Sequence, residues 1–324
     1  MKVVYLLPSD MLTEWILGSL ESINDNRQFD ISVCRYDRIG VPVDHGILDR
    51  VSRDKPDCVL YVSQAAGPFV PSISTFKSIS RGTPLVHICL DAGDVGFVPM
   101  LTKWRDNDCF TYTVACDGCA TGPVDFISFH PVDVRPYRTS EGMGERHYVA
   151  LEERPLALGT CGGFPYGLRK QVMDALTARC GLVMKQREEV YGSYSRYSRF
   201  LMSCQIVPDC ALSAGGPEGK GPYAKTLKTR AIEVGLAGAC LLELRGCALN
   251  KWATEDVDYA TYATAEEACD VCSDLMRDHD RASRLAHNLS AVVRDKMNPT
   301  IFYSAIFKAC GLSFHSTHTT PSSL

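Results

Sequence analysis

At 324 residues the chain exceeds the size that a single hydrophobic core usually supports, which predicts two domains. Its composition is ordinary for a globular protein, with 45% hydrophobic and 22% charged residues and a formal net charge of −4. This charge gives no support for a protein that holds nucleic acid by bulk positive charge. No apolar run approaches the roughly 18 residues that are needed to cross a bilayer.

The N-terminal stretch MKVVYLLPSD has only a short apolar run and no small-residue cleavage site, so it predicts a first strand and not a signal peptide. We therefore expect a cytoplasmic protein, in which the fifteen cysteines stay reduced. Two C-x-x-C pairs, Cys116/Cys119 and Cys269/Cys272, could supply four thiolates only if two distant segments met. We interpret them as packing residues and expect no metal.

The first half of the chain alternates strand-like and helical stretches. Strands are predicted at 3–7, 29–36, 57–63, 84–90, 110–116 and 124–129, and helices at 11–23, at 43–54 and before residue 82. Nearly continuous apolar strands separated by helices indicate a parallel sheet that is covered on both faces. Residues 1–138 are therefore predicted to form a Rossmann-like domain.

The same alternation restarts after a polar, acidic and glycine-containing stretch at 139–154, which we interpret as a linker. Strands are predicted at 156–163, 181–186, 205–213 and 239–244, and helices at 166–180, 193–203, 224–238 and 265–278, with a long polar helix after them. A second Rossmann-like domain should span 155–297. Residues 298–312 form an amphipathic helix, and 313–324 lack an apolar anchor and should be flexible.

The resulting fold class is α/β, with two doubly wound parallel-sheet domains in tandem. In such folds ligands bind outside the carboxyl ends of the strands. We therefore expect a cleft between the two domains, with the functional residues on the loops that follow the strands.

A basic loop leads into the helix predicted at 224–238. Between Gly219 and Arg230 there are three further cations, Lys220, Lys225 and Lys228, and no acid. Free amides at a helix N-terminus, the helix dipole and nearby cations together favour a diphosphate site that needs no metal. A solvated basic turn is the alternative.

Glu233 lies one helical turn beyond Arg230. Its carboxylate could accept two ribose hydroxyls from a nucleotide that is bound at the basic loop. The alternative is a weak i, i+3 ion pair with Arg230 on the helix surface.

Three blocks of this half resemble the C-terminal domain of GT-B glycosyltransferases. They are YSRFLMSCQIVP (197–208), KTRAIEVGLAGACLLE (228–243) and YATAEEA (262–268). Within the group 1 glycosyltransferases the resemblance is strongest to the spore-maturation-protein-like (CgeB-like) branch. The stretch FHPVDVRPY (129–137) also resembles the end of that family's first domain.

The resemblance implies roles for individual residues. Glu233 matches the glutamate that binds the donor ribose, and Arg230 with Lys225 or Lys228 would neutralise the diphosphate. Many retaining members carry a second glutamate eight positions before the first, where this chain has Lys225. This departure leaves the stereochemical outcome open.

The resemblance also places Gly162 and Gly163 in the turn beneath the donor, where glycine lets backbone amides approach phosphate. An ordinary strand-to-helix turn is the alternative. The resemblance further implies that the helix at 298–312 crosses back and packs on the first domain. The co-substrate would be a UDP- or GDP-linked sugar, with no separate cofactor.

Sugar transfer also needs a group that takes the proton of the attacking hydroxyl. Asp91 and Asp94 follow the strand at 84–90, Asp10 follows the first strand, and Asp117 follows the fifth. We favour Asp91 as the base, with Asp94 and Asp10 as further candidates. Any of these aspartates could instead cap the helix that follows it.

Three other features are interpreted as parts of the core. His87 and His130 lie within apolar strands, which is typical of buried histidines. The stretch YGSYSRYSRF (191–200) interleaves tyrosine and arginine as single-strand-binding surfaces do. Helical spacing, however, places Tyr197 and Phe200 on one buried face.

These observations predict a metal-independent glycosyltransferase that moves a sugar from a nucleotide-diphosphate donor to a hydroxyl acceptor. The acceptor could be a saccharide, a small molecule, a protein or a modified nucleobase. The alternatives are a transferase acting on a hydroxymethylated DNA base, a nucleotide-sugar epimerase and a non-enzymatic sugar- or nucleotide-binding protein. A dinucleotide-dependent dehydrogenase is disfavoured, because the turn after the first strand lacks G-x-G-x-x-G.

Overall fold

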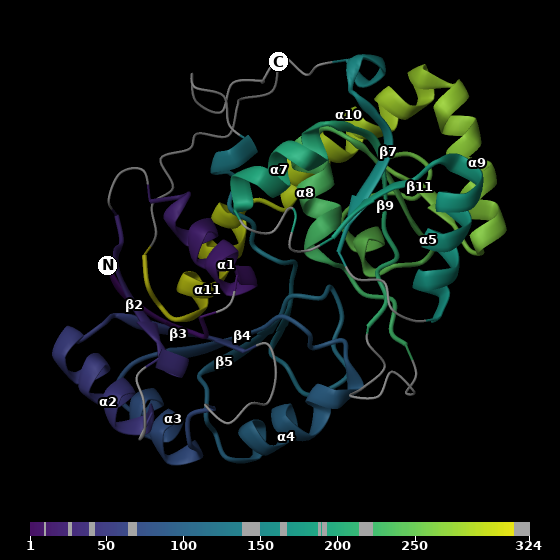
Figure 1. The fold of residues 1–324 in the computed structure, drawn as a ribbon. Helices are drawn as coiled ribbons and strands as arrows, with labels where there is room; N and C mark the ends of the chain where they lie inside the picture. Colours follow the sequence, from purple (N-terminus) through teal and green to yellow (C-terminus); the bar gives the residue numbers. More distant parts are fainter. Residues whose placement is uncertain are drawn as a thin grey trace.

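The computed structural model describes residues 1–9, 11–24, 28–38, 43–63, 70–137, 150–162, 167–186, 189, 193–213 and 223–313, with the backbone alone at 11–14. The described residues form two α/β domains, each built around one sheet in which every strand pair is parallel (Figure 1). The predicted fold class is therefore confirmed. No helix in these ranges is long and apolar enough to span a membrane.

The N-terminal sheet has the strand order β2-β1-β3-β4-β5-β6. Its strands are β1 (Lys2–Leu7), β2 (Asp30–Arg35), β3 (Cys58–Ser63), β4 (Leu85–Cys89), β5 (Tyr112–Ala115) and β6 (Phe126–Ile127). Every residue of β3 and β4 is buried, which explains their unbroken apolar sequences.

Helices cover both faces of this sheet. They are α1 (Met11–Glu21), α2 (Val43–Asp54), α3 (Ile73–Ser80) and α4 (Val98–Asp106), with short 3-10 helices η1 (Tyr36–Arg38), η2 (Val95–Phe97) and η3 (Arg135–Tyr137). Figure 1 shows α2, α3 and α4 on one face and α1 on the other. The sequence analysis did not predict α4, which buries only Leu101 and Trp104.

The C-terminal sheet has the order β11-β10-β9-β7-β8. Its strands are β7 (Leu156–Cys161), β8 (Val183–Lys185), β9 (Cys204–Pro208), β10 (Cys240–Leu244) and β11 (Ala260–Tyr262). Its helices are η4 (Leu151–Glu153), α5 (Gly167–Cys180), α7 (Tyr194–Met202), α8 (Thr229–Ala237), η5 (Ala248–Lys251), α9 (Ala265–Arg277) and α10 (His279–Lys296). In both domains the first strand lies between the second and the third, so each sheet has a switch point beside its first strand.

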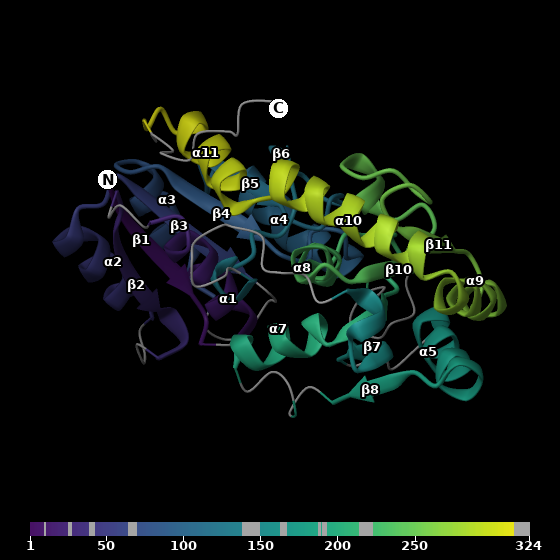
Figure 2. The ribbon, with the colours of Figure 1, turned by 90° about the horizontal axis from the view of Figure 1, so that it is seen from above.

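The last helix, α11 (Pro299–Ala309), packs on the N-terminal domain. Figure 2 shows α10 and α11 following one another across both domains. The Tyr303 hydroxyl lies 3.1 Å from that of Tyr5 in β1 and 2.9 Å from that of Ser19 in α1. Phe307 packs on Phe29 with a ring-centroid distance of 5.4 Å. The chain thus crosses between the domains twice.

Helix α8 is shorter than predicted. It begins at Thr229 instead of residue 224, because 223–228 are extended and pair with 211–213. The Thr226 amide donates to the Ala211 carbonyl over 2.8 Å, and the Leu227 amide donates to the Asp117 carbonyl over 2.6 Å. Backbone partners outside the helix therefore replace the first predicted turn, and Lys228 becomes the N-cap residue.

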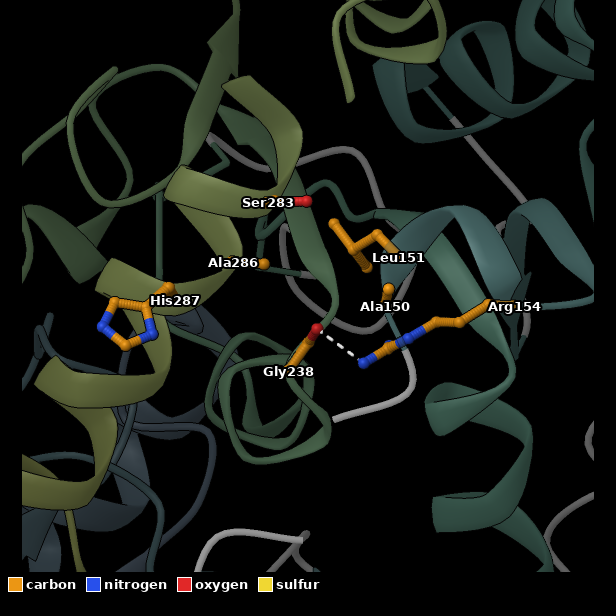
Figure 3. Close-up of a pocket in the computed structure, with 7 residues that line it drawn as sticks. All are labelled: Ala150, Leu151, Arg154, Gly238, Ser283, Ala286 and His287. Carbon is orange, nitrogen blue, oxygen red and sulfur yellow. Dashed lines mark hydrogen bonds between the residues drawn. The ribbon is translucent and has the colours of Figure 1, made fainter. Parts of the chain in front are cut away.

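The other end of α8 is held by Arg154, which is buried. Its guanidinium donates to the carbonyls of Cys204, Ala237 and Gly238 over 2.8–3.1 Å. Figure 3 shows the bond to Gly238. Gly238 ends the helix in the left-handed conformation, with φ of 62°. A cation at this position satisfies the last carbonyls and complements the helix dipole. Arg154 also lines a cavity of about 240 Å³ next to α10.

We predict that Arg154→Met lowers the free energy of unfolding by about 2–3 kcal/mol, since it leaves buried carbonyls at the end of α8 without donors. Urea denaturation followed by circular dichroism measures the loss. Arg179→Met is the matched control, because Arg179 forms an exposed ion pair with Asp270 and should cost less than about 1 kcal/mol. Equal losses in the two variants would contradict this role for Arg154.

Candidate functional site

The two domains meet at Lys228, the residue that precedes α8. Its Nζ lies 3.0 Å from Oδ1 of Asp117 and 3.1 Å from Oδ1 of Asp91. The two aspartates each stand two residues beyond a strand, β5 and β4, which are neighbours in the N-terminal sheet. Because the carboxyl ends of parallel strands share one edge, both carboxylates reach the same cation of the other domain.

Asp117 is the centre of this contact. Its carboxylate is fully buried; Oδ1 also lies 3.3 Å from Nε2 of His130, and Oδ2 accepts the Gly93 amide over 3.1 Å. Burial alone would raise the pKa of Asp117, but Lys228 and His130 outweigh burial and lower it. Burial would likewise lower the pKa of Lys228, and the two aspartates outweigh it and raise that pKa. Both groups are therefore charged at neutral pH.

The backbones of the two domains come very close around this ion pair. A Cβ on Gly93 would lie 2.7 Å from Cγ2 of Thr226, and one on Gly118 would lie 2.8 Å from Cβ of Ala248. The ammonium of Lys251 donates to the Gly118 carbonyl over 2.6 Å. Glycine is thus required at both positions for the domains to approach this closely.

Arg230, to which the resemblance gave the donor diphosphate, is bound in this structure by groups of its own domain. Its Nη1 lies 2.7 Å from the carboxylate of Asp209, which is fully buried, and its Nη2 donates to the Cys161 carbonyl over 2.5 Å. These partners stand at the ends of β9 and β7. Arg230 thereby ties two strand ends of the C-terminal sheet together, and its charge is balanced by Asp209.

Glu233 is buried in α8, with 1% of its surface exposed, so it does not lie on the helix surface as the alternative of an ion pair with Arg230 would require. Oε2 accepts the Tyr197 hydroxyl over 2.7 Å, whereas Oε1 has no hydrogen-bond partner in the described part of the chain. Burial raises the pKa of Glu233 to about 7, although the hydrogen bond from Tyr197 acts in the opposite direction.

Glu233 is linked through the Tyr197 hydroxyl to an aromatic cluster with members from both domains. Trp15 of α1 stacks on Tyr197 of α7, with ring centroids 5.1 Å apart and an interplanar angle of 17°. The ring centroid of Tyr194 lies 4.6 Å from that of Trp15 and 6.1 Å from that of Tyr137 in η3. Tyr197 is buried, as its helical spacing predicted. The pairing of Trp15 with α7 joins residues about 180 positions apart, which sequence reasoning could not find.

Two other predicted donor-side residues have partners that the sequence did not indicate. Gly162 has φ of 111°, a conformation that favours glycine, but its amide donates to the Lys185 carbonyl over 3.2 Å. Lys225 is exposed, and its ammonium donates to the Arg245 carbonyl over 2.7 Å. Both groups are therefore engaged with backbone carbonyls away from Lys228 and its two aspartates.

The predicted bases differ in their surroundings. Asp94 caps η2, because its Oδ1 accepts the Gly96 amide over 2.8 Å. This is the helix-capping role that the sequence analysis gave as the alternative to a base. The Asp91 side chain, by contrast, is 42% exposed. Three predicted site residues lie outside the described residues: Asp10, Gly163 and Lys220.

His87 and three of the four paired cysteines belong to the cores, whereas Cys119 is half-buried, with its thiol 3.9 Å from the Lys225 carbonyl of the other domain. His87 is fully buried, and its Nε2 lies 2.6 Å from the Ser63 hydroxyl. Burial lowers the pKa of His87 to about 3. Cys116 lies in the core of the N-terminal domain, and Cys269 and Cys272 lie in that of the C-terminal domain. In the described ranges no three His, Cys, Asp or Glu side chains are grouped so that they could hold a metal ion.

Comparison with known proteins relates this geometry to solved structures. No protein-family profile matches the sequence, and no curated protein matches it. HepE from Anabaena, solved with UDP and glucose, is similar with a TM-score of 0.60 and 12% identity, over 96% of this chain and 99% of HepE. A glycosyltransferase from Rickettsia africae has a TM-score of 0.60 and 9% identity, over 95% of this chain and 97% of that protein.

A proposed UDP-N-acetylglucosamine 2-epimerase from Listeria monocytogenes is also similar, with a TM-score of 0.53 and 12% identity, over 98% of this chain and 99% of that protein. These likenesses extend over both domains. The chain therefore has the GT-B fold, two parallel-sheet α/β domains that face each other.

The raised pKa of Glu233 predicts a pH dependence of stability. A carboxyl whose pKa rises from 4.5 to about 7 on folding stabilises the fold fully below pH 4.5, and this contribution is lost as the pH rises through 7. Glu233→Gln, which mimics the protonated carboxyl, should differ from the wild type by less than about 1 kcal/mol at pH 5. At pH 8 it should be more stable by about 1–3 kcal/mol.

Urea denaturation at both pH values measures this difference. Glu266→Gln is the control, because Glu266 is exposed in the first turn of α9 and should show no such pH-dependent gain. If the Glu233→Gln effect were the same at pH 5 and pH 8, the raised pKa would be refuted.

Proposed function

We propose that this protein is a glycosyltransferase that moves a sugar from a nucleotide-diphosphate donor, UDP- or GDP-linked, to a hydroxyl acceptor without a metal ion. The observation that carries the proposal is the position of Lys228 within a GT-B fold. The cation stands at the N-terminus of α8, between the two domains, and meets a candidate base of the opposite domain at 3.1 Å.

The cation and the helix suit a departing diphosphate. Negative charge builds on the leaving group during sugar transfer, and a fixed ammonium stabilises it. No side chain caps the N-terminus of α8, so its first amides and the positive end of its dipole add to Lys228. Arg230 acts indirectly in this proposal, by holding the end of β9 through Asp209.

Asp91 is the proposed base. A general base must reach a proton of the acceptor, which requires an accessible carboxylate. The Asp91 side chain is 42% exposed, whereas Asp117 is fully buried and Asp94 is engaged as a cap. The acceptor would bind on the N-terminal domain, on the side from which Asp91 projects.

Glu233 is proposed to accept the ribose hydroxyls of the donor, as the resemblance to the spore-maturation-protein-like branch implies. Its Oε1, which has no hydrogen-bond partner within the described residues, supports this role. Because Glu233 is buried, access to it requires movement of neighbouring residues such as Tyr197, on which Trp15 stacks. Donor binding would therefore be coupled to the arrangement of α1 against α7.

A nucleotide-sugar epimerase is the second candidate, supported by the likeness to the proposed epimerase from Listeria monocytogenes. The two activities differ in their products. A transferase releases one nucleoside diphosphate for each sugar that it moves, whereas an epimerase returns an altered nucleotide sugar. Chromatography of the nucleotides after incubation with a nucleotide sugar separates the two.

The test of donor binding is thermal stability measured against a panel of nucleotides and nucleotide sugars, with no added metal. We expect one nucleoside diphosphate, UDP or GDP, to raise the melting temperature selectively. Lys228→Met should weaken the affinity for that diphosphate at least tenfold in calorimetry, because the fixed cation is lost. Lys170→Met is the control, since Lys170 lies on the exposed face of α5 and should leave the affinity unchanged.

A flat response across the panel would refute the proposed function. Unchanged diphosphate affinity in Lys228→Met would refute the assignment of Lys228 and leave the activity to be explained by other residues.

A further inference from the structure

We propose that Asp117 is a positioning residue that holds Lys228 in place, and that Asp91 is the partner which the donor diphosphate displaces from Lys228. This inference rests on the proposed function. It assigns different tasks to two carboxylates that contact one ammonium at nearly equal distances, 3.0 Å and 3.1 Å.

The surroundings of Asp117 suit a permanent partner. Its carboxylate has no exposed surface and also binds His130 and the Gly93 amide, and its own carbonyl accepts the Leu227 amide. Removing the cation from it would leave a buried carboxylate without its counter-charge, which is strongly unfavourable. Asp117 thus binds the segment that carries Lys228 through both its side chain and its backbone.

The surroundings of Asp91 suit an exchangeable partner. The side chain is 42% exposed, and water can solvate its carboxylate when the ammonium leaves. Lys228 itself keeps 21% exposure, so an anion can reach it. In the structure the Asp91 carboxylate therefore occupies the place at Lys228 that a phosphate oxygen would take.

The exchange links the donor to the base. While Asp91 is bound to Lys228, its Oδ1 is engaged by the ammonium at 3.1 Å and cannot also accept the proton of an acceptor hydroxyl. A diphosphate that takes over the ammonium releases Asp91 toward the acceptor side. The two substrates should consequently bind in order, with the donor first.

The first arm of the test is UDP affinity, with GDP alongside, by isothermal titration calorimetry on the full chain. Asp91→Asn removes the competitor at Lys228, so the affinity for the bound diphosphate should rise about two- to fivefold, the worth of a partly exposed ion pair. Asp106→Asn, on the exposed side of α4, controls for the change in net charge and should leave the affinity unchanged. Unaltered or weaker binding in Asp91→Asn would overturn the exchange.

The second arm tests whether Asp117 positions Lys228 or only competes with the diphosphate for its ammonium. Asp117→Glu keeps the charge but shifts the carboxylate by one methylene, and Asp117→Asn removes the charge. If Asp117 only competed with the diphosphate, Asp117→Asn would tighten binding as Asp91→Asn does. A positioning residue predicts that both Asp117 variants weaken binding at least fivefold, and that this effect disappears in the Lys228→Met background.

The outcomes are distinguishable from failure of the proposed function. If the wild type binds neither UDP nor GDP, the proposed function fails. If it binds one of them and Asp117→Asn tightens that binding, or the Asp117 effects persist without Lys228, the positioning role is overturned. Circular dichroism checks the fold of each variant, and the Asp91→Asn arm still decides the exchange if neither Asp117 variant folds.

Discussion

The arrangement of the two domains depends on one ion pair, between the buried Asp117 of the first domain and Lys228 of the second. A carboxylate without access to water needs a counter-charge, and Lys228 of the second domain supplies it at 3.0 Å. The glycines at 93 and 118 follow from this constraint, because any side chain there would push the backbones apart. So does the extended course of 223–228, which brings Lys228 to Asp117.

The same constraint determines the charge that is available at the site. Arg230 is balanced by Asp209, and Lys228 is shared by two carboxylates, so these two cations of the basic loop form a cluster in which both are already paired with aspartates. Anion binding at such a cluster requires an exchange of partners. Glu233 is buried and accepts the hydroxyl of Tyr197, on which Trp15 of the other domain stacks. The candidate donor site and the placement of the domains are thus energetically coupled.

Much of the fold was predictable because burial on both faces of a parallel sheet demands continuous apolar strands, as β3 and β4 show. Helix α4 was missed because its buried face consists of two residues, and β11 because three residues carry no periodicity. The first turn of the helix at 224–238 was predicted wrongly, since propensity favours a helix there but long-range backbone partners do not. Asp91, Lys228 and Glu233 were identified as candidates, yet not their partners.

The sequence by itself determined the class of fold and the order of its elements, because hydrophobic periodicity is a local property of the chain. It also placed acids and bases directly after strands, where ligands of such folds bind. Only the tertiary structure decided which of these charges is buried, exchangeable or already neutralised. That depends on contacts such as Asp117 with Lys228 and Trp15 with Tyr197, which join residues more than a hundred positions apart and leave no local signal in the sequence.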